Sequence, residues 1–210
     1  MANYCSNGIV FYSKSKELLT DLWNKMDSCI EDGDNNIKKL LKGCDCTQEE
    51  ADEWADGRDY LVYLDDKVHD DDGLYYFRAD TESAWAPNID SFTFLLEEKY
   101  NDKIKLFYQS EEPGCGVFVT NDAEGIFFSD RYKMDCSLDG HFITGYYASF
   151  EDLLEDVNEI FPKAGVTDKD SIEAMEAKIK TAYKIAGNID DYIVIAEFVY
   201  DNEIRGGLAA

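Results

Sequence analysis

The residues that could do chemistry in this chain are six cysteines, two histidines and a large excess of carboxylates. Cys44 and Cys46 are one residue apart, and two thiolates on such a turn could begin a zinc site. A structural zinc site needs a second ligand pair, and His69 and His141 are distant in sequence from each other and from these cysteines. We therefore expect two small thiols on a loop and no metal site.

A calcium loop begins but is not completed in the sequence. Asp135, Ser137, Asp139 and Gly140 match the first, third, fifth and sixth positions of such a loop. The twelfth position, which should supply a bidentate glutamate, is Tyr146. This pattern favours a hairpin turn over a cation site.

Phosphate-binding and nucleophile motifs are also missing. The sequence contains no GxxxxGK[ST], GxGxxG or GxSxG. With two histidines in the chain, a Ser-His or Cys-His dyad has no supporting motif. We expect no cofactor and no catalytic residue, and a protein that is not an enzyme.

Charge is the strongest functional signal in the chain. The sequence has 45 Asp+Glu against 20 Lys+Arg, a formal net charge of −25. Such a surface repels phosphate, so we expect no direct contact with nucleic acid. Two segments are especially acidic, and together with one turn they give the candidate partner-binding residues. These are Asp45, Glu49, Glu50, Asp52, Glu53, Asp56, Asp70, Asp71, Asp72, Glu151, Asp152, Glu155, Asp156 and Glu159.

Two interpretations of this acidity stay open. Acidic surfaces can serve only solubility, or they can meet a protein partner with a basic surface. The second interpretation includes a more specific form. In it the carboxylates imitate DNA phosphates and bind in the groove with which a nucleic-acid-binding protein holds DNA. The first residues lack a signal-peptide pattern and no stretch is long and apolar enough to span a bilayer, so we expect a cytoplasmic protein without membrane contact.

The hydrophobic pattern predicts an α+β fold. Strand-like and helix-like segments alternate in the order β-α-β-β-α-β over the first part of the chain, with extra helical pieces after the first helix. This order is typical of a ferredoxin-like core, an antiparallel sheet with its helices on one face. We place that core at 1–138 and an α/β extension at 139–210, packed on the core or continuous with it. A further hairpin is predicted from Val117 to Thr120 and Gly125 to Lys133.

Three short motifs resemble those of the YubB-like (Api-type) family, uncharacterised proteins of plasmids, phages and other mobile elements. They are the N-Y-C-S-N opening at 3–7, S-A-W-A-P at 83–87, and E-E-P-G-C-G at 111–116. The resemblance covers about the first 135 residues and implies a ferredoxin-like fold in a mobile-element setting. It implies no catalytic residue. The motif positions are Asn3, Cys5, Asn7, Trp85, Pro87, Glu112, Gly114 and Gly116.

The residue types in these motifs favour structural roles. Trp85 is expected to anchor the core, Pro87 to set the entry of a helix, and Gly114 and Gly116 to adopt positive φ in a tight turn. Two other functions remain open. One is a small-molecule binder or enzyme with a cleft between core and extension, near Trp85 and the turn at Glu111 and Glu112. The other is a structural homodimer formed through an exposed sheet edge.

Overall fold

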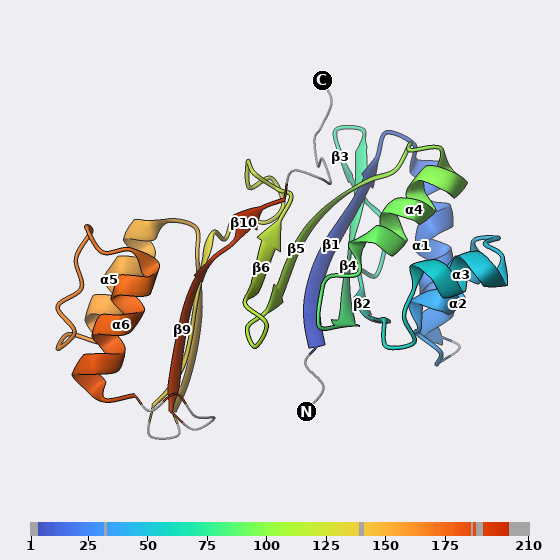
Figure 1. Ribbon diagram of the computed structural model, residues 1–210. Coiled ribbons are helices and arrows are strands. Elements are labelled where there is room, and N and C mark those ends of the chain that lie inside the picture. The colour runs from blue at the N-terminus through green and yellow to red at the C-terminus, as the bar shows by residue number, and fades with distance from the viewer. Residues whose placement is uncertain (1–3, 32, 139–140, 186, 188–190, 202–210) are drawn as a thin grey trace. The chain divides into compact units, whose positions relative to one another are not determined.

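A computed structural model describes residues 4–31, 33–138, 141–185, 187 and 191–201 of the 210 (Figure 1). The chain divides into two compact units, Met1–Ala123 with Tyr200–Ala210, and Glu124–Val199. Both combine helices with antiparallel strands, so the α+β fold class is confirmed.

The first unit is built on a sheet of seven strands. Its order is β10-β6-β5-β1-β4-β2, with β3 paired to the far end of β4. The described register makes β1 antiparallel to both β4 and β5, and β2 antiparallel to β4. The strands are β1 (Tyr4–Ser13), β2 (Tyr60–Leu64), β3 (His69–Asp71), β4 (Leu74–Ala84), β5 (Lys105–Glu112), β6 (Val117–Thr120) and β10 (Val199–Tyr200).

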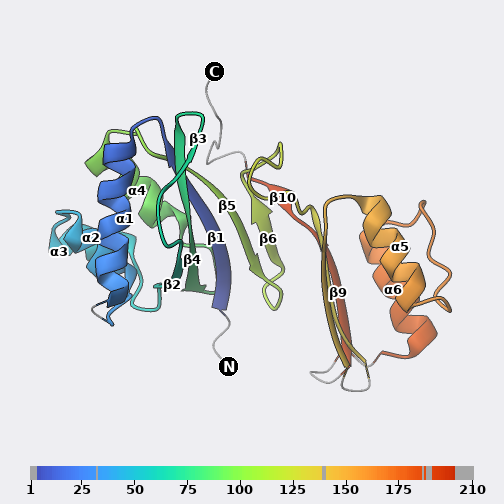
Figure 2. The same ribbon diagram turned by 180° about the vertical axis from the view of Figure 1, so that it is seen from behind.

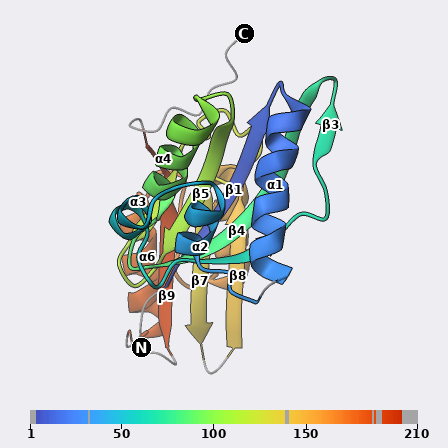
Figure 3. The same cartoon turned by 90° about the vertical axis from the view of Figure 1, so that its right-hand side faces the viewer.

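The helices of the first unit lie on one face of this sheet (Figures 2 and 3). They are α1 (Lys16–Glu31), α2 (Ile37–Gly43), α3 (Gln48–Trp54) and α4 (Ile89–Tyr100). Side chains cap two of these helices: Ser15 Oγ accepts the Leu18 N–H at the start of α1, and Thr47 with Glu50 forms a complete capping box at α3. Local signals therefore determine where these helices start.

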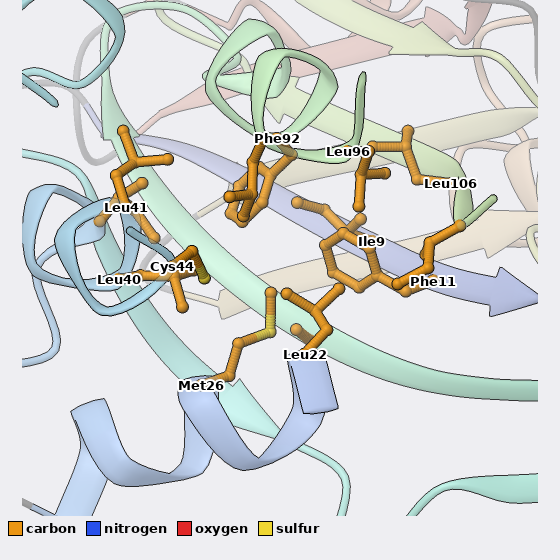
Figure 4. Close-up of a cluster of buried hydrophobic side chains, with 14 of the residues drawn as sticks. Ile9, Phe11, Leu22, Met26, Leu40, Leu41, Cys44, Phe92, Leu96 and Leu106 are labelled. Atoms are coloured by element: carbon orange, nitrogen blue, oxygen red, sulfur yellow. The ribbon is translucent and has the colours of Figure 1, made fainter. Parts of the chain in front are cut away.

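The core of the first unit lies between the helices and the sheet (Figure 4). Phe11 of β1 is fully buried, with its ring centroid 5.2 Å from that of Phe77 and 5.5 Å from that of Phe92 of α4. Leu22 and Met26 of α1 pack into the same cluster. The strands contribute alternate positions to this cluster, namely Ile9 and Phe11 of β1, Phe77 and Ala79 of β4, and Leu106 and Tyr108 of β5.

A bulge in β2 keeps its apolar residues in the core. The pairing with β4 shifts between Leu61 and Tyr63. Leu61 is buried and Leu64 packs against the same cluster, although three positions separate them. The extra residue leaves Val62 and Tyr63 exposed at 49% and 47%. Strict alternation would have turned one of the two leucines outward.

The second unit is a three-stranded sheet with two helices. The strand order is β8-β7-β9, and both described pairings are antiparallel. Apolar side chains of both helices join those of the sheet in one cluster, which includes Leu153, Met175 and Ile193. The elements are β7 (Tyr132–Leu138), β8 (His141–Tyr147), α5 (Phe150–Ile160), α6 (Ile172–Tyr183) and β9 (Tyr192–Glu197).

Two features differ from the sequence predictions. The division falls at 123/124, earlier than the expected 138/139, because β7 and β8 pair as a hairpin within the second unit. The predicted hairpin of Val117–Thr120 with Gly125–Lys133 does not form. Instead β6 pairs with β5 across the turn at Pro113–Gly116, and the chain from 121 to 131 carries no strand.

None of the described helices has both the length and the apolar character needed to cross a membrane.

Candidate interaction surfaces

Helix α5 carries the clearest acidic surface of the second unit. Ser149 caps the helix by accepting the Asp152 N–H at 3.1 Å. Leu153 and Val157 are buried, which fixes the orientation of the helix on its sheet. Glu151, Glu155 and Glu159 follow one another at four-residue steps, and all three are exposed. We name these three residues the α5 stripe.

The other two predicted carboxylates of α5 have local structural roles. Asp152 accepts a hydrogen bond from the hydroxyl of Ser149 at 2.6 Å, within the cap. Asp156 accepts the hydroxyl of Tyr147 on the neighbouring strand. Burial of the Tyr147 hydroxyl, followed by this hydrogen bond, raises its pKa above the ordinary value. Of the five predicted acids on this helix, Asp152 and Asp156 are therefore used in local hydrogen bonds, and the three of the α5 stripe are exposed.

The acidic group around α3 is partly neutralised. Asp52 meets Lys38 at 3.0 Å, and Asp56 meets Arg58 at 3.8 Å. Glu50 serves the capping box, and its hydrogen bonds with Thr47 lower its pKa. The remaining predicted residues here, Asp45, Glu49 and Glu53, are exposed.

The three aspartates at the end of β3 form a turn. Asp70 Oδ1 accepts the Gly73 N–H at 3.1 Å, and Asp72 and Gly73 both have positive φ, 49° and 86°. This geometry is the tight hairpin turn that Asp-Gly favours. Asp71 and Asp72 are exposed at its tip. The structure thus places the fourteen predicted carboxylates in three groups, two on the first unit and one on the second.

The three family-like motifs converge at one end of the first sheet. Cys5 lies at the start of β1 and pairs with Ser83 near the end of β4. Ser6 pairs with Glu111 near the end of β5, so Glu112 and its turn lie beside Cys5. Because both neighbouring strands run antiparallel to β1, their ends meet its beginning.

Asn7 is the centre of this motif cluster. It is 1% exposed, and its Nδ2 donates to Ser83 Oγ at 3.0 Å and contacts Thr81 Oγ1 at 3.3 Å. Ser83 in turn donates to the Ala86 carbonyl at 2.7 Å, which holds the segment leading into α4. Asn7 therefore supports the structural interpretation of the motif.

Cys5 and Glu112 are buried at the same end. Burial, with a further contribution from the Glu112 carboxylate, raises the pKa of the Cys5 thiol to about 12. Such a thiol stays protonated and is a poor nucleophile or metal ligand. Glu112 itself accepts the N–H of Cys115 within the turn. The arrangement stabilises a turn and gives no reactive group.

Three expectations for these motifs need correction or restriction. Trp85 is not a core anchor, since it is 46% exposed and its φ of 71° turns the chain where the strand ends. Of the two glycines, Gly116 has positive φ (68°) and Gly114 does not. Asn3 lies outside the described residues. Pro87 precedes α4 by two positions, with Asn88 as the N-cap.

The cysteines and the half-motif for calcium form no metal site in the described part of the chain. Cys44 and Cys46 are buried, and burial raises the pKa of both, that of Cys44 to about 12. Asp135 accepts the hydroxyl of Thr144 at 3.1 Å within the β7–β8 hairpin. Asp139 and Gly140, the rest of the calcium pattern, lie outside the described residues.

The candidate partner-binding residues leave out carboxylates that lie within strands. Asp80 and Glu82 of β4 and Glu111 of β5 are on the same face, because residues two apart in a strand point the same way. Phe77, Ala79 and Thr81 alternate with the two acids of β4 and are buried. This alternation in the sequence could have shown that Asp80 and Glu82 face away from the core.

No family model, no curated protein and no solved structure matches this chain.

Proposed function

We propose that this chain is an acidic, non-enzymatic interaction protein whose exposed carboxylates contact a basic surface on a protein partner. The α5 stripe carries the proposal. In the part of the chain that the structure describes, no ion pair includes Glu151, Glu155 or Glu159. Like charges at this spacing destabilise a helix by about 0.2–0.5 kcal/mol per pair. A basic partner would relieve that repulsion on binding.

A sharper form of this function is imitation of DNA. Four residues of helix rise by about 6 Å, so the α5 stripe holds its charges in a rigid row. Duplex DNA likewise presents regularly spaced charges on a stiff backbone. We propose that the partner is a nucleic-acid-binding protein, whose basic groove would accept such a row.

The first unit supports the same proposal through its expected family. We propose a ferredoxin-like core for it, supported by the order β5-β1-β4-β2, in which the first and third strands of a βαββαβ unit are central. The convergence of the three motifs at one end of the first sheet supports the YubB-like resemblance and the mobile-element setting that it implies. A mobile element has a use for proteins that block host nucleic-acid-binding enzymes.

The test is a pull-down from bacterial lysate at low and high salt. The α5 variant removes the charges of the α5 stripe by Glu151→Gln, Glu155→Gln and Glu159→Gln. The control variant makes the same change of charge in α1, by Glu17→Gln, Asp27→Asn and Glu31→Gln. We expect wild type to retain basic nucleic-acid-binding proteins at low salt, and duplex DNA to compete them off. Retention should fall in the α5 variant and persist in the α1 variant. If wild type retains no such protein at low salt, the proposal is abandoned.

A homodimer is the second candidate, favoured by one exposed residue. Phe142 of β8 is 70% exposed on an edge strand of the second sheet. Edge strands with exposed apolar residues tend to pair with another chain. Light scattering should then give twice the mass for wild type and a monomer for Phe142→Lys. A monomeric wild type excludes this candidate.

A further inference from the structure

Strand β8 forms one edge of the second sheet, and in the described part of the chain it pairs with β7 alone. Figure 3 shows it at the margin of this sheet, with β7 beside it and β9 on the far side. An edge strand presents a row of backbone N–H and C=O groups that can pair with another extended chain. Soluble proteins therefore shorten, bulge, charge or cover their edge strands.

The other outer strands of this protein are protected in these ways. In the first sheet β10 has two residues, β2 is bulged between Leu61 and Tyr63, and β3 has three residues of which two are aspartates. In the second sheet the other edge is β9, and there the Ile195 N–H donates to the Glu176 carboxylate of α6 at 3.2 Å. Each of these strands is a poor template for a further strand.

Strand β8 lacks these protections within the described residues. Its seven residues, H-F-I-T-G-Y-Y, include no Asp, Glu, Lys, Arg or Pro, in a chain of which 31% of the residues are charged. Its register with β7 runs without a shift from His141 to Tyr147. Phe142 is 70% exposed. A regular, uncharged strand of this length is a template on which another strand can add.

The alternation of backbone bonds identifies the groups of β8 that point outward. Directly before β7, the Arg131 carbonyl accepts the Phe198 N–H at 2.9 Å, so the odd-numbered residues of β7 bond toward β9 and the even-numbered ones toward β8. The even-numbered residues of β7 pair with odd-numbered residues of β8. Phe142 and Thr144 therefore direct their backbone N–H and C=O groups away from β7. We name this outward side of the strand the β8 edge.

Helix α5 places carboxylates above this strand. The helix packs on β7 and β8, whereas α6 packs on β9. The Tyr147 hydroxyl lies over Gly145, where it fills the space that a Cβ would need, and it donates to Asp156. The Asp156 side of α5 therefore lies toward β8. Glu159 is three residues further along and exposed on the same side of the helix, whereas Glu151 is turned away from that side by about 140°.

A strand added along the β8 edge would present its side chains alternately to the two faces of the sheet. Ile143 packs against the core below the helices, so its neighbour Phe142 points to the opposite face. On the helix side the added strand meets the carboxylate of Glu159, and on the opposite face it meets the exposed ring of Phe142. The segment that fits is therefore extended, with basic and apolar residues in alternation.

We propose that the β8 edge binds an extended segment of the basic partner, in which basic and apolar residues alternate, as an additional strand of the second sheet. The inference rests on the proposed function, because it assumes that the partner is basic. It adds the conformation and the sequence pattern of the segment that is bound, whereas the α5 stripe attracts any cation. It differs from the homodimer, in which a second copy of this chain occupies the same edge.

The experiment measures binding of a fluorescent peptide of alternating lysine and valine to the full chain, by anisotropy at physiological ionic strength, where distant charges are largely screened. A second peptide, N-methylated at two adjacent central residues, keeps every side chain and loses a backbone donor on each of its edges. The edge variant is Thr144→Pro, which removes an outward N–H without breaking a bond to β7. Its matched control is Thr144→Ala, because both substitutions lose the hydroxyl that donates to Asp135 at 3.1 Å.

We expect Thr144→Pro and the N-methylated peptide each to weaken binding about tenfold, which is the size of one or two backbone hydrogen bonds. Thr144→Ala should change binding little. A second matched pair tests the charge, because Glu159→Gln should weaken binding about twofold and Glu151→Gln, on the other side of the same helix, should change it less. Circular dichroism checks that Thr144→Pro is folded, and the N-methylated peptide tests the pairing on wild type.

Three outcomes overturn the inference in distinguishable ways. If the N-methylated peptide binds as tightly as its parent, charge alone attracts the peptide, and the β8 edge fails while the proposed function stands. If a monomeric wild type binds neither peptide, the β8 edge fails, and the pull-down decides the proposed function separately. If light scattering gives a wild-type dimer that excludes the peptide and that Thr144→Pro dissociates, a second copy of the chain occupies the edge instead.

Discussion

Asn7 and Ser83 are joined by a hydrogen bond of 3.0 Å, from the Asn7 side-chain amide to the Ser83 hydroxyl, although 76 positions separate them. The bond is buried and connects the first strand to the end of β4. It turns two sequence motifs into one structural element, because Ser83 also holds the chain that leads into α4.

Replacing Asn7 with alanine should destabilise the first unit. The Thr81 and Ser83 hydroxyls would lose a buried donor, and each buried polar group left unsatisfied costs about 1–3 kcal/mol. We expect a loss of about 2–4 kcal/mol in the free energy of unfolding, measured in urea. Ser6→Ala, at the exposed neighbouring position, is the control and should stay within about 0.5 kcal/mol. Equal stability of Asn7→Ala and wild type would contradict the role of this cluster.

Asp59 should make stability fall as the pH rises. The residue is 3% exposed, and burial raises its pKa to about 6 despite the N–H of Asp56 that its carboxylate accepts. A raised pKa means that the folded state favours the protonated acid. Its stabilising contribution is therefore complete below about pH 4, the ordinary pKa range, and is lost as the pH rises through about 6.

The measurement is the free energy of unfolding of wild type and Asp59→Asn between pH 4 and 7. Asparagine can still accept the Asp56 N–H and carries no charge. The variant should gain on wild type as the pH rises, by about 2–3 kcal/mol across the window. Asp66→Asn, which removes an exposed carboxylate, controls for the loss of one negative charge. Curves for wild type and Asp59→Asn that stay parallel would show that Asp59 is already ionised when folded.

Local features can be predicted from the sequence because their causes are local. The capping box at Thr47 and Glu50, the Ser149 cap and the Asp-Gly turn each depend on residues within a few positions of one another. A short stretch of sequence is therefore enough to place each of them.

The errors came from contacts between distant segments. Trp85 was expected in the core because of its size, yet the positive φ that ends β4 turns it outward. The strand predicted at Gly125–Lys133 has β-forming residues, but β6 pairs with β5 and β7 with β8 and β9. For the candidate site, composition located the acidic segments and could not tell the exposed α5 stripe from carboxylates used in caps and ion pairs.

Cys115 should react with a thiol reagent much faster than the other cysteines. It is exposed in the turn after β5, whereas Cys5, Cys44 and Cys136 are buried with raised pKa values. Because the thiolate is the reactive form, a buried thiol with a pKa near 12 reacts only when the protein opens. Iodoacetamide at pH 8 followed by mass spectrometry should show one rapid modification, abolished by Cys115→Ser. Early labelling of Cys5 would mean that this end of the sheet opens readily.

The bulge in β2 makes opposite predictions for two adjacent residues. Leu61 is 1% exposed in the core, and Val62 is 49% exposed on the extra position. Leu61→Ala should cost about 2–5 kcal/mol in the free energy of unfolding, and Val62→Ala less than about 0.5 kcal/mol. Deleting Val62 should also cost far less than Leu61→Ala. Without the extra residue, Leu61 and Leu64 are two positions apart, and regular alternation keeps both on the core side. A deletion variant as unstable as Leu61→Ala would contradict the assignment of Val62 as the extra residue of a bulge.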